Sequence, residues 1–368
     1  MKTRTAILTA VFAMAIIVVG AFLPTGLEPA ALAQPSDDRA GAEPLTELKI
    51  IEKVTAATDR ALKYLASKQR PDGGWHNNDA VNALALLAFM GRGHVPGRGP
   101  YKDVLERGKK FMLGTAKPNG LFAFAEGHHG PMYEHGLATL ALAEMYGMDP
   151  DPELEEKVRK AVDLIVRSQH PIGGWRYNPS PTDHDLSVSV MQIVALRAAN
   201  NAEIPVPAQT IEKAIDYVRR CAYPTGGYGY QPGHGPKAQT TAAGTLSLQL
   251  LGKYDDPTIP KALKWLEGVP IVWGTSQPGY PYSLEYFYYF HYYAIQAHYQ
   301  AGGKEWNNWH PRIRDLLLEK QNPDGSWNVP PSTAEANEGS VGPNKVYWTA
   351  MASLVLDIYM HFLPAYQR

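Results

Sequence analysis

The segment Leu62–Trp75, with the sequence LKYLASKQRPDGGW, sets the fold because the chain repeats its pattern. It reads as an amphipathic helix, then a turn rich in Pro and Gly, then an aromatic residue. Three further clear copies and two weaker ones follow the same order: Val162–Trp175 (VDLIVRSQHPIGGW), Ile215–Tyr228 (IDYVRRCAYPTGGY), Ile313–Trp327 (IRDLLLEKQNPDGSW), Phe111–Phe122 and Leu263–Tyr280. The closing aromatics stand at positions 75, 122, 175, 228, 280 and 327, which gives six units of about 50 residues.

A second, less charged helix is predicted after each turn. These helices are expected over residues 79–90, 134–146, 185–199, 239–251, 285–300 and 345–361. A helix that is apolar nearly all round is buried, whereas the first helix of each unit carries charge on one face. Because one helix pair cannot cover its own apolar face, neighbouring units must stack. The sequence therefore predicts an all-α fold, an (α/α)6 toroid with an inner and an outer ring of six helices each.

Three of the turns resemble the QW motif of the prenyltransferase and squalene oxidase repeat family, which includes terpenoid cyclases and protein prenyltransferases. The matching pairs are Gln69 with Trp75, Gln169 with Trp175, and Gln321 with Trp327. The resemblance runs from about Leu48 to the C-terminus and implies the same toroid. The motif is structural, since Gly permits a tight turn, Gln can satisfy a helix end and the indole can cover it.

The N-terminal region has the features of a targeting signal. Residues 1–33 have the form of a secretory signal peptide, with a basic start, an apolar stretch over Ala6–Leu23 and the cleavage site Ala31-Leu32-Ala33. We therefore expect the protein to be exported to the periplasm or to another extracytoplasmic location, or to be secreted. The alternative is an uncleaved anchor, because this apolar stretch can nearly span a bilayer, and we expect membrane association only in that case. Residues 34–47 are expected to form a flexible lead-in and residues 48–368 a single toroid domain.

Composition excludes several classes of function. A formal net charge of −1 argues against a nucleic-acid partner, whose binding needs a basic surface. The single cysteine, Cys221, excludes an intramolecular disulfide and every multi-cysteine metal site. In the family that the turns resemble, protein prenyltransferases bind zinc through an Asp-x-Cys motif. Here Arg219, and not Asp, stands two positions before Cys221, so we do not expect zinc-dependent protein prenylation. His128 and His129 lie near Glu134 without a metal-binding pattern, and we expect neither a metal nor a cofactor.

Polar residues at the starts of the apolar helices are the candidate catalytic groups. The segment Asp183-His184-Asp185-Leu186 stands where the resemblance implies the acidic Asp-x-Asp-Asp motif of a cyclase. The resemblance then implies that Asp185 protonates an alkene or epoxide, with Asp183 beside it and Leu186 in place of the third Asp. Glu134 and His135 occupy the related place in the second unit. The alternative is that Asp185 or Asp183 only caps the following helix, a role that Asp favours.

Aromatic residues are the candidate cavity lining. The run YFYYFHYY places Tyr286, Tyr289 and Tyr293 at the start of one inner helix, and Tyr347 starts another. His184 and Thr240 stand at the starts of two more. Tyrosine faces can stabilise a cation or stack on a sugar ring. The sequence therefore leaves three functions open: a class II terpene-cyclase-like enzyme or isoprenoid-binding protein, a non-catalytic extracytoplasmic binding or scaffold protein, and a polysaccharide-active toroid enzyme with paired carboxylates.

Overall fold

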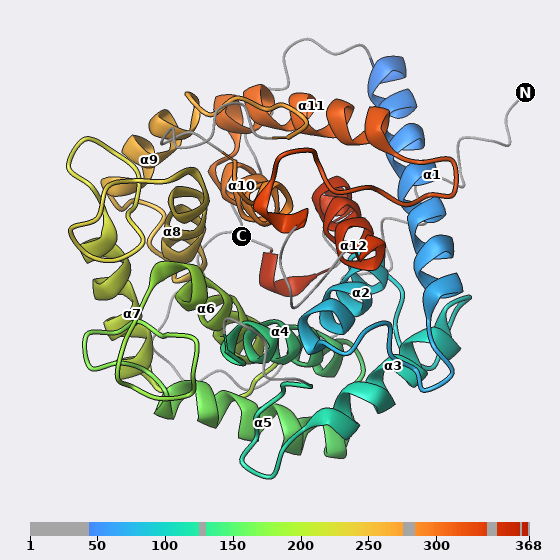
Figure 1. Cartoon of the computed structure of the whole chain (residues 1–368), viewed down its shortest axis with the longest axis horizontal. Coiled ribbons are helices and arrows are strands. Elements are labelled where there is room, and N and C mark those ends of the chain that lie inside the picture. Colours follow the sequence, from blue (N-terminus) through green and yellow to red (C-terminus); the bar gives the residue numbers. More distant parts are fainter. Residues whose placement is uncertain (1–43, 125–129, 275–283, 337–343, 361–362, 367–368) are drawn as a thin grey trace, which may run out of the picture. The chain divides into compact units, whose positions relative to one another are not determined.

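The computed structural model describes residues 44–124, 130–274, 284–336, 344–360 and 363–366 (Figure 1). These residues contain twelve α-helices and no strand. The odd-numbered helices are α1 (Pro44–Lys68), α3 (Lys102–Thr115), α5 (Pro152–Arg167), α7 (Ala208–Cys221), α9 (Thr258–Leu266) and α11 (Gly303–Lys320). The even-numbered helices are α2 (Asp79–Gly91), α4 (Met132–Met148), α6 (Leu186–Asn201), α8 (Ala238–Leu250), α10 (Phe287–Ala301) and α12 (Lys345–Leu356). Short 3₁₀ turns are η1 (Ala334–Ala336), η2 (Asp357–Met360) and η3 (Pro364–Tyr366).

The helices form two concentric rings, as the sequence predicts. The even-numbered helices form the inner ring and contact one another in chain order, and α12 packs against α2 to close it (Figure 1). The odd-numbered helices form the outer ring, which α11 and α1 close. The inner helices α2 and α8 are buried along their entire length, whereas α5 and α7 bury one stripe. This arrangement confirms the (α/α)6 toroid.

The Gln of each full motif ties its turn to the next outer helix. Gln69 Nε2 donates to Gly73 O and to Val104 O in α3, both at 2.9 Å. The other two motifs make the same pair of bonds: Gln169 to Gly173 and Thr210, and Gln321 to Gly325 and Ala57. Because Ala57 lies in α1, the last motif joins the sixth unit to the first and closes the outer ring.

The glycine and the indole of the motif are fixed by close contacts. Gly173 has a φ of 109°, and a Cβ there would lie 1.9 Å from the carbonyl oxygen of Lys213 in α7. Only glycine can adopt this conformation and let the next helix approach so closely. Trp175 is fully buried, and its Nε1 donates at 2.7 Å to Ile165 O near the end of α5. Trp75 and Trp327 make the equivalent bonds to Leu65 and Leu317.

In five of the six inner helices, all but α10, a polar side chain accepts the backbone N–H of the turn aromatic. Asn82 accepts from Trp75, His135 from Phe122, Ser189 from Trp175, Thr241 from Tyr228, and Thr349 from Trp327. A buried N–H must find a partner, and the sequence supplies one of four residue types at this place. These polar residues at the starts of the inner helices therefore have a structural role, which is to hold the turn that precedes each helix.

The C-terminal residues close the end of the inner ring where the inner helices terminate. Glu144 Oε1, in the last turns of α4, accepts the backbone N–H of Ala365 at 2.8 Å. Asn201 at the end of α6 donates to Pro364 O at 3.1 Å. The starts of the inner helices, where the candidate residues lie, are therefore at the opposite end.

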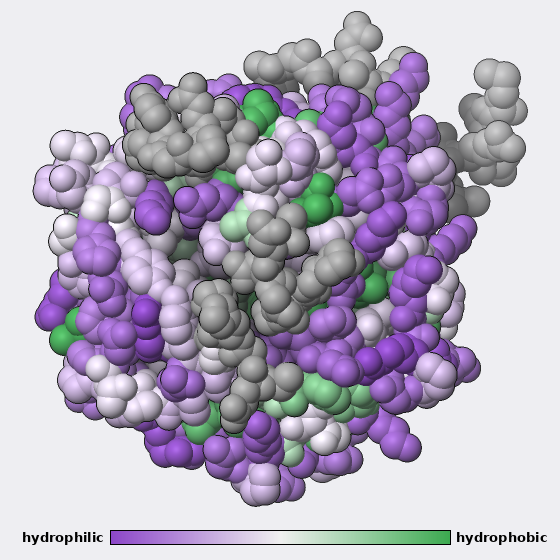
Figure 2. Space-filling model, in the orientation of Figure 1, coloured by the Kyte–Doolittle hydropathy of each residue, from purple (hydrophilic) through white to green (hydrophobic). Residues whose placement is uncertain are grey.

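The described surface is mostly hydrophilic in the view of Figure 2, with hydrophobic residues in separate spots. No helix among the described residues is long and apolar enough to cross a membrane. The expected signal peptide lies outside the described residues, as do His128 and His129. Helix α1 begins at Pro44, within the stretch expected to be a flexible lead-in, and the rest of that stretch also lies outside them.

Candidate functional site

Tyrosines from three inner helices come together on the inner side of the ring. Tyr289 and Tyr293 of α10 lie with their ring centres 4.8 Å apart. Burial raises the pKa of both well above the ordinary value, and Tyr347 of α12 and Tyr133 of α4 are near enough to add to the rise. The structure thus brings together three of the four tyrosines that the sequence singles out. We call Tyr133, Tyr289, Tyr293 and Tyr347 the tyrosine cluster.

Ser187 in the first turn of α6 connects this cluster to Asp185. The Tyr133 hydroxyl lies 2.7 Å from Ser187 Oγ, and the Tyr289 hydroxyl donates to Ser187 O at 3.1 Å. Ser187 Oγ in turn donates to Asp185 Oδ1 at 2.6 Å. Burial and the Asp185 charge raise the pKa of Tyr133 well above its ordinary value, so this hydroxyl stays protonated. Tyr289 therefore reaches across the lumen from α10 to α6.

Asp185 caps α6 and forms a buried ion pair. Its Oδ1 accepts the N–H of Val188 at 2.9 Å, and its Oδ2 accepts from Arg176 Nη1 at 2.5 Å. Arg176 also pairs with Asp183 at 3.0 Å and donates to Tyr230 at 2.5 Å. The Asp185 side chain is fully buried. A carboxylate that accepts from a guanidinium, a hydroxyl and a backbone N–H has its oxygens engaged by the fold, which suits a cap better than a proton donor.

Both nitrogens of the candidate His135 are used by the fold. Its Nδ1 accepts the N–H of Phe122 at 3.2 Å, and its Nε2 lies 3.1 Å from Ala161 O. Burial lowers the pKa of His135 to about 4, so the ring is neutral at physiological pH. Neither nitrogen is left for proton transfer, and the role of His135 that this geometry supports is structural.

The candidate Glu134 faces Asp79 in the seam between α4 and α2. Glu134 Oε2 accepts the N–H of Asp79 at 2.7 Å and that of Phe124 at 3.2 Å. Its Oε1 is buried without a hydrogen-bond partner among the described residues. The buried carboxylate of Asp79 has Thr115 and Asn82 as polar neighbours. Burial, with a contribution from the nearby Glu134 charge, raises the pKa of Asp79 to about 7. Burial also raises the pKa of Glu134. Asp79 therefore keeps its proton up to about neutral pH, whereas Glu134 takes the hydrogen bonds of an anion.

The remaining candidates lie apart from the tyrosine cluster. His184 Nδ1 is 3.2 Å from the hydroxyl of Tyr217 on the outer helix α7. Thr240 donates to the carbonyl of the turn residue Tyr228 at 2.7 Å. Tyr286 directly precedes α10. His184 and Thr240 are thus engaged by the turns. Among the residues that the structure describes, no group of three or more His, Cys, Asp or Glu side chains could hold a metal ion.

Sequence reasoning did not single out several members of this site. Tyr133, Ser187 and Arg176 matter because of the partners that the ring brings to them, and no local pattern marks them. Asp79 is different, because the sequence does mark it: it follows a turn and starts an apolar helix, as Glu134 does. Its place opposite Glu134 could only be seen once α2 and α4 were adjacent.

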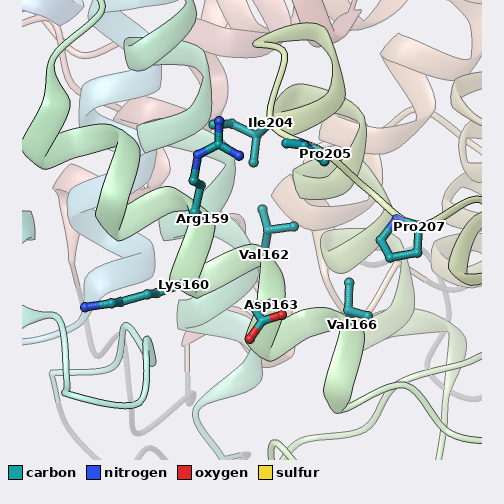
Figure 3. Close-up of a pocket in the computed structure, with 8 residues that line it drawn as sticks. All are labelled: Arg159, Lys160, Val162, Asp163, Val166, Ile204, Pro205 and Pro207. Carbon is teal, nitrogen blue, oxygen red and sulfur yellow. The ribbon is translucent and has the colours of Figure 1, made fainter.

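A separate groove of about 360 Å³ lies on the outer wall beside α5 (Figure 3). Val162, Val166 and Ile204 contribute apolar surface to it. Arg159 and Lys160 at its edge already pair with Glu155 and Glu156 on the same helix. None of the candidate residues lies in this groove.

Sequence comparison relates the chain to terpenoid cyclases. It is 28% identical to lanosterol synthase erg7A of Aspergillus fumigatus over 136 residues, which cover 34% of this chain and 17% of the synthase. It is 29% identical to drimenyl diphosphate synthase of Streptomyces showdoensis over 161 residues, which cover 40% of this chain and 29% of that protein. The chain thus spans less than a third of the length of these relatives.

Structural comparison finds the same toroid in proteins of different activity. The type II terpene cyclase MstE of Scytonema superimposes with a TM-score of 0.59 and 16% identity, covering 85% of this chain and 99% of the cyclase. A cellobiose 2-epimerase of Bacillus thermoamylovorans superimposes with a TM-score of 0.62 and 12% identity, covering 84% and 99%. Such likenesses show the fold alone. The sequence model of the prenyltransferase alpha-alpha toroid domain matches residues 40–269, more than half of the chain. The protein therefore belongs to the prenyltransferase α/α-toroid family.

Proposed function

We propose that this protein binds an isoprenoid chain in the lumen of its inner ring. The observation that carries the proposal is the tyrosine cluster, which brings aromatic side chains of α4, α10 and α12 close together inside the inner ring. Aromatic side chains offer large apolar contact surfaces, and their faces attract positive charge. The kinship with lanosterol synthase and drimenyl diphosphate synthase supports the choice of an isoprenoid.

The proposal is binding and not cyclisation with Asp185 as the acid. A class II cyclase must hold a carboxylic acid that still carries its proton when the substrate arrives. The oxygens of Asp185 are instead engaged as acceptors by Arg176, Ser187 and Val188, which hold the side chain at the start of α6. If Asp185 were the acid, Asp185→Asn would abolish turnover of a polyene and leave its binding intact. We expect the wild-type protein itself not to turn over a polyene, so that Asp185→Asn has no activity to abolish.

The test is to identify what the purified protein retains from a cell extract. The protein is denatured in organic solvent, and the released compounds are analysed by mass spectrometry beside those from Tyr289→Ala. A polyprenoid retained by the wild type and lost from the variant is the expected result. A retained oligosaccharide would instead favour the polysaccharide-active alternative, for which the epimerase toroid gives the fold precedent. A protein that releases neither would be a scaffold.

We also propose that the protein is exported through residues 1–33. The support is the basic start, the apolar stretch and the small residues before position 34. Sequencing the N-terminus of the protein from a secreting host tests this, with cleavage after Ala33 expected. An intact Met1 in the membrane fraction would show an anchor instead.

A further inference from the structure

Three buried histidines lie where the inner helix α10 packs against the outer helix α11. His291 and His298 belong to α10 and His310 to α11, and the exposed fractions of the three residues are 1%, 1% and 3%. The ring of His298 stacks on the indole of Trp309 across the seam, with the ring centres 4.2 Å apart. His310 stacks on Trp306 at the same distance. We call His291, His298 and His310 the histidine cluster.

His291 lies among aromatic rings and has no hydrogen bond to any described residue. Neither of its ring nitrogens has a partner there. The ring contacts Phe287 and Phe290, with the ring centres 4.4 and 4.8 Å apart, and it faces Trp309 of α11 at 6.1 Å. A neutral imidazole has one N–H donor, whereas a protonated one has two and a positive charge. The surroundings of His291 therefore offer no acceptor for the proton that it would gain.

The groups that face His291 also disfavour a positive charge on it. The charges that act on it are those of Arg312 in α11 and of His298 two turns later in α10. Burial, with these two groups, lowers the pKa of His291 to about 3. Burial likewise lowers the pKa of His298 to about 4 and that of His310 to about 3. All three rings are therefore neutral in the folded protein at neutral pH.

Two carboxylates lie near the other two histidines, and both are engaged elsewhere. Glu267, at the end of α9, acts on His298, but it pairs with a lysine of the same helix. Asp315 acts on His310 together with Arg314, with which it pairs at 2.8 Å. The two carboxylates are 37% and 65% exposed, so water and salt screen their charge. Neither is placed to hold a buried imidazolium.

Helix α11 is weakened at the level of the histidine cluster. Pro311 follows His310 inside the helix and has no N–H to donate to the carbonyl four residues before it. A single residue, Gly302, with a φ of 68°, separates α10 from α11. A helix that lacks an internal hydrogen bond and depends on one buried stripe opens locally at a lower cost than the core around it. The seam is therefore a place where local opening can precede unfolding of the whole protein.

We propose that the seam between α10 and α11 is an acid-sensitive switch, closed while the histidine cluster is neutral and opened when the cluster takes up protons. Opening brings water to the three rings, and each then binds a proton at its ordinary pKa of about 6.5. Below that pH the open state binds more protons than the closed one, so opening becomes easier as pH falls. Because α10 also carries Tyr289 and Tyr293, opening loosens the helix that holds half of the tyrosine cluster.

The test is hydrogen exchange of the full chain between pH 7.5 and pH 4.5, followed by mass spectrometry of its peptides. The rates are corrected for the intrinsic pH dependence of amide exchange. We expect peptides of α11 to exchange at least about tenfold faster for each pH unit below about 6.5. Peptides of α8, a helix without histidine, are the internal control and should keep their corrected rates. A flat profile in α11 overturns the proposal, and so does an equal acceleration in α8, which would mean that the whole protein unfolds.

A pair of variants then locates the proton. His291→Phe keeps an aromatic ring beside Phe287, Phe290 and Trp309 and removes one titratable group. We expect the acceleration of α11 exchange to be smaller than in the wild type by about a factor of ten for each pH unit. His234→Phe, at an exposed position before α8, is the matched control and should follow the wild type. An acceleration in His291→Phe equal to that of the wild type would contradict the role of His291. Circular dichroism at pH 7.5 checks that both variants fold, and the wild-type profile decides the proposal independently of them.

Discussion

Replacement of Asp79 by Asn should make the protein more stable at neutral pH, by an amount that depends on pH. Burial raises the pKa of Asp79 from its ordinary value of 3.8 to about 7. Between these values the folded protein keeps a proton that the unfolded chain releases, so the free energy of unfolding falls as pH rises. At about 1.4 kcal/mol for each pH unit, the loss between pH 4 and pH 7 is about 4 kcal/mol. Asn carries no titrating proton and avoids this loss.

The assay is urea denaturation of the wild type and Asp79→Asn at several pH values from 4 to 8, followed by circular dichroism. The quantity of interest is the difference between their free energies of unfolding. Burial also raises the pKa of Glu144 and of Asp357 to about 7, but these groups are present in both proteins and cancel in the difference. We expect the difference to grow by about 4 kcal/mol up to pH 7 and then to level off.

The control is Asp163→Asn, at a side chain on α5 that is 68% exposed and pairs with Arg167. Exposed pairs of this kind contribute little, so its difference from the wild type should stay within about 0.5 kcal/mol at every pH. A flat difference for Asp79→Asn between pH 4 and pH 7 would refute the reasoning, because it would mean that Asp79 ionises as easily in the folded protein as in the unfolded chain.

Three further predictions concern the turns and the closed end. Gly173→Ala should lower the free energy of unfolding by more than about 3 kcal/mol, measured in thermal melts, because its Cβ would meet a backbone oxygen. In the control Gly114→Ala, in α3, the Cβ meets no atom within 4 Å, and we expect the free energy of unfolding to rise by up to about 1 kcal/mol. Gln321→Ala removes the bond to Ala57 that joins the last turn to α1, together with the bond to Gly325 within the turn, and should cost about 1–3 kcal/mol; an unchanged melting temperature would argue against that role. Glu144→Ala should speed hydrogen exchange at the Ala365 amide, which loses its acceptor; unchanged protection there would show that other contacts hold the C-terminal turn.

The repeat was readable from the sequence because its signals are local. The glycine turns, the Gln-x5-Trp spacing and the contrast between charged and apolar helices all lie within single units. The predicted inner helices match the observed ones to within a few residues at each end, as for 79–90 against Asp79–Gly91. The last one departs most, because the α-helix ends at Leu356 and the 3₁₀ turn η2 continues to Met360.

The candidate site was only partly readable, because its geometry depends on which residues face each other across the ring. The sequence marked Tyr289, Tyr293 and Tyr347, since a dense aromatic run at the start of an inner helix is conspicuous. It could not show that Tyr133 completes the cluster from α4. Nor could it show that both nitrogens of His135 are committed to the backbone. The role of Asp185 as an acid stays a prediction that its contacts with Arg176 and Ser187 do not support.

The sequence by itself thus determined the number of units, the order of their helices and the turns between them, since each depends on residues close together in the chain. Only the tertiary structure decided which polar side chains are caps, which are paired and which are buried without a partner. The physical reason is that the charge state of a carboxylate depends on burial and on neighbours. Arg176, which pairs with Asp185, is nine residues away, and Glu134, whose charge adds to the effect of burial on the pKa of Asp79, is fifty-five residues away in another unit.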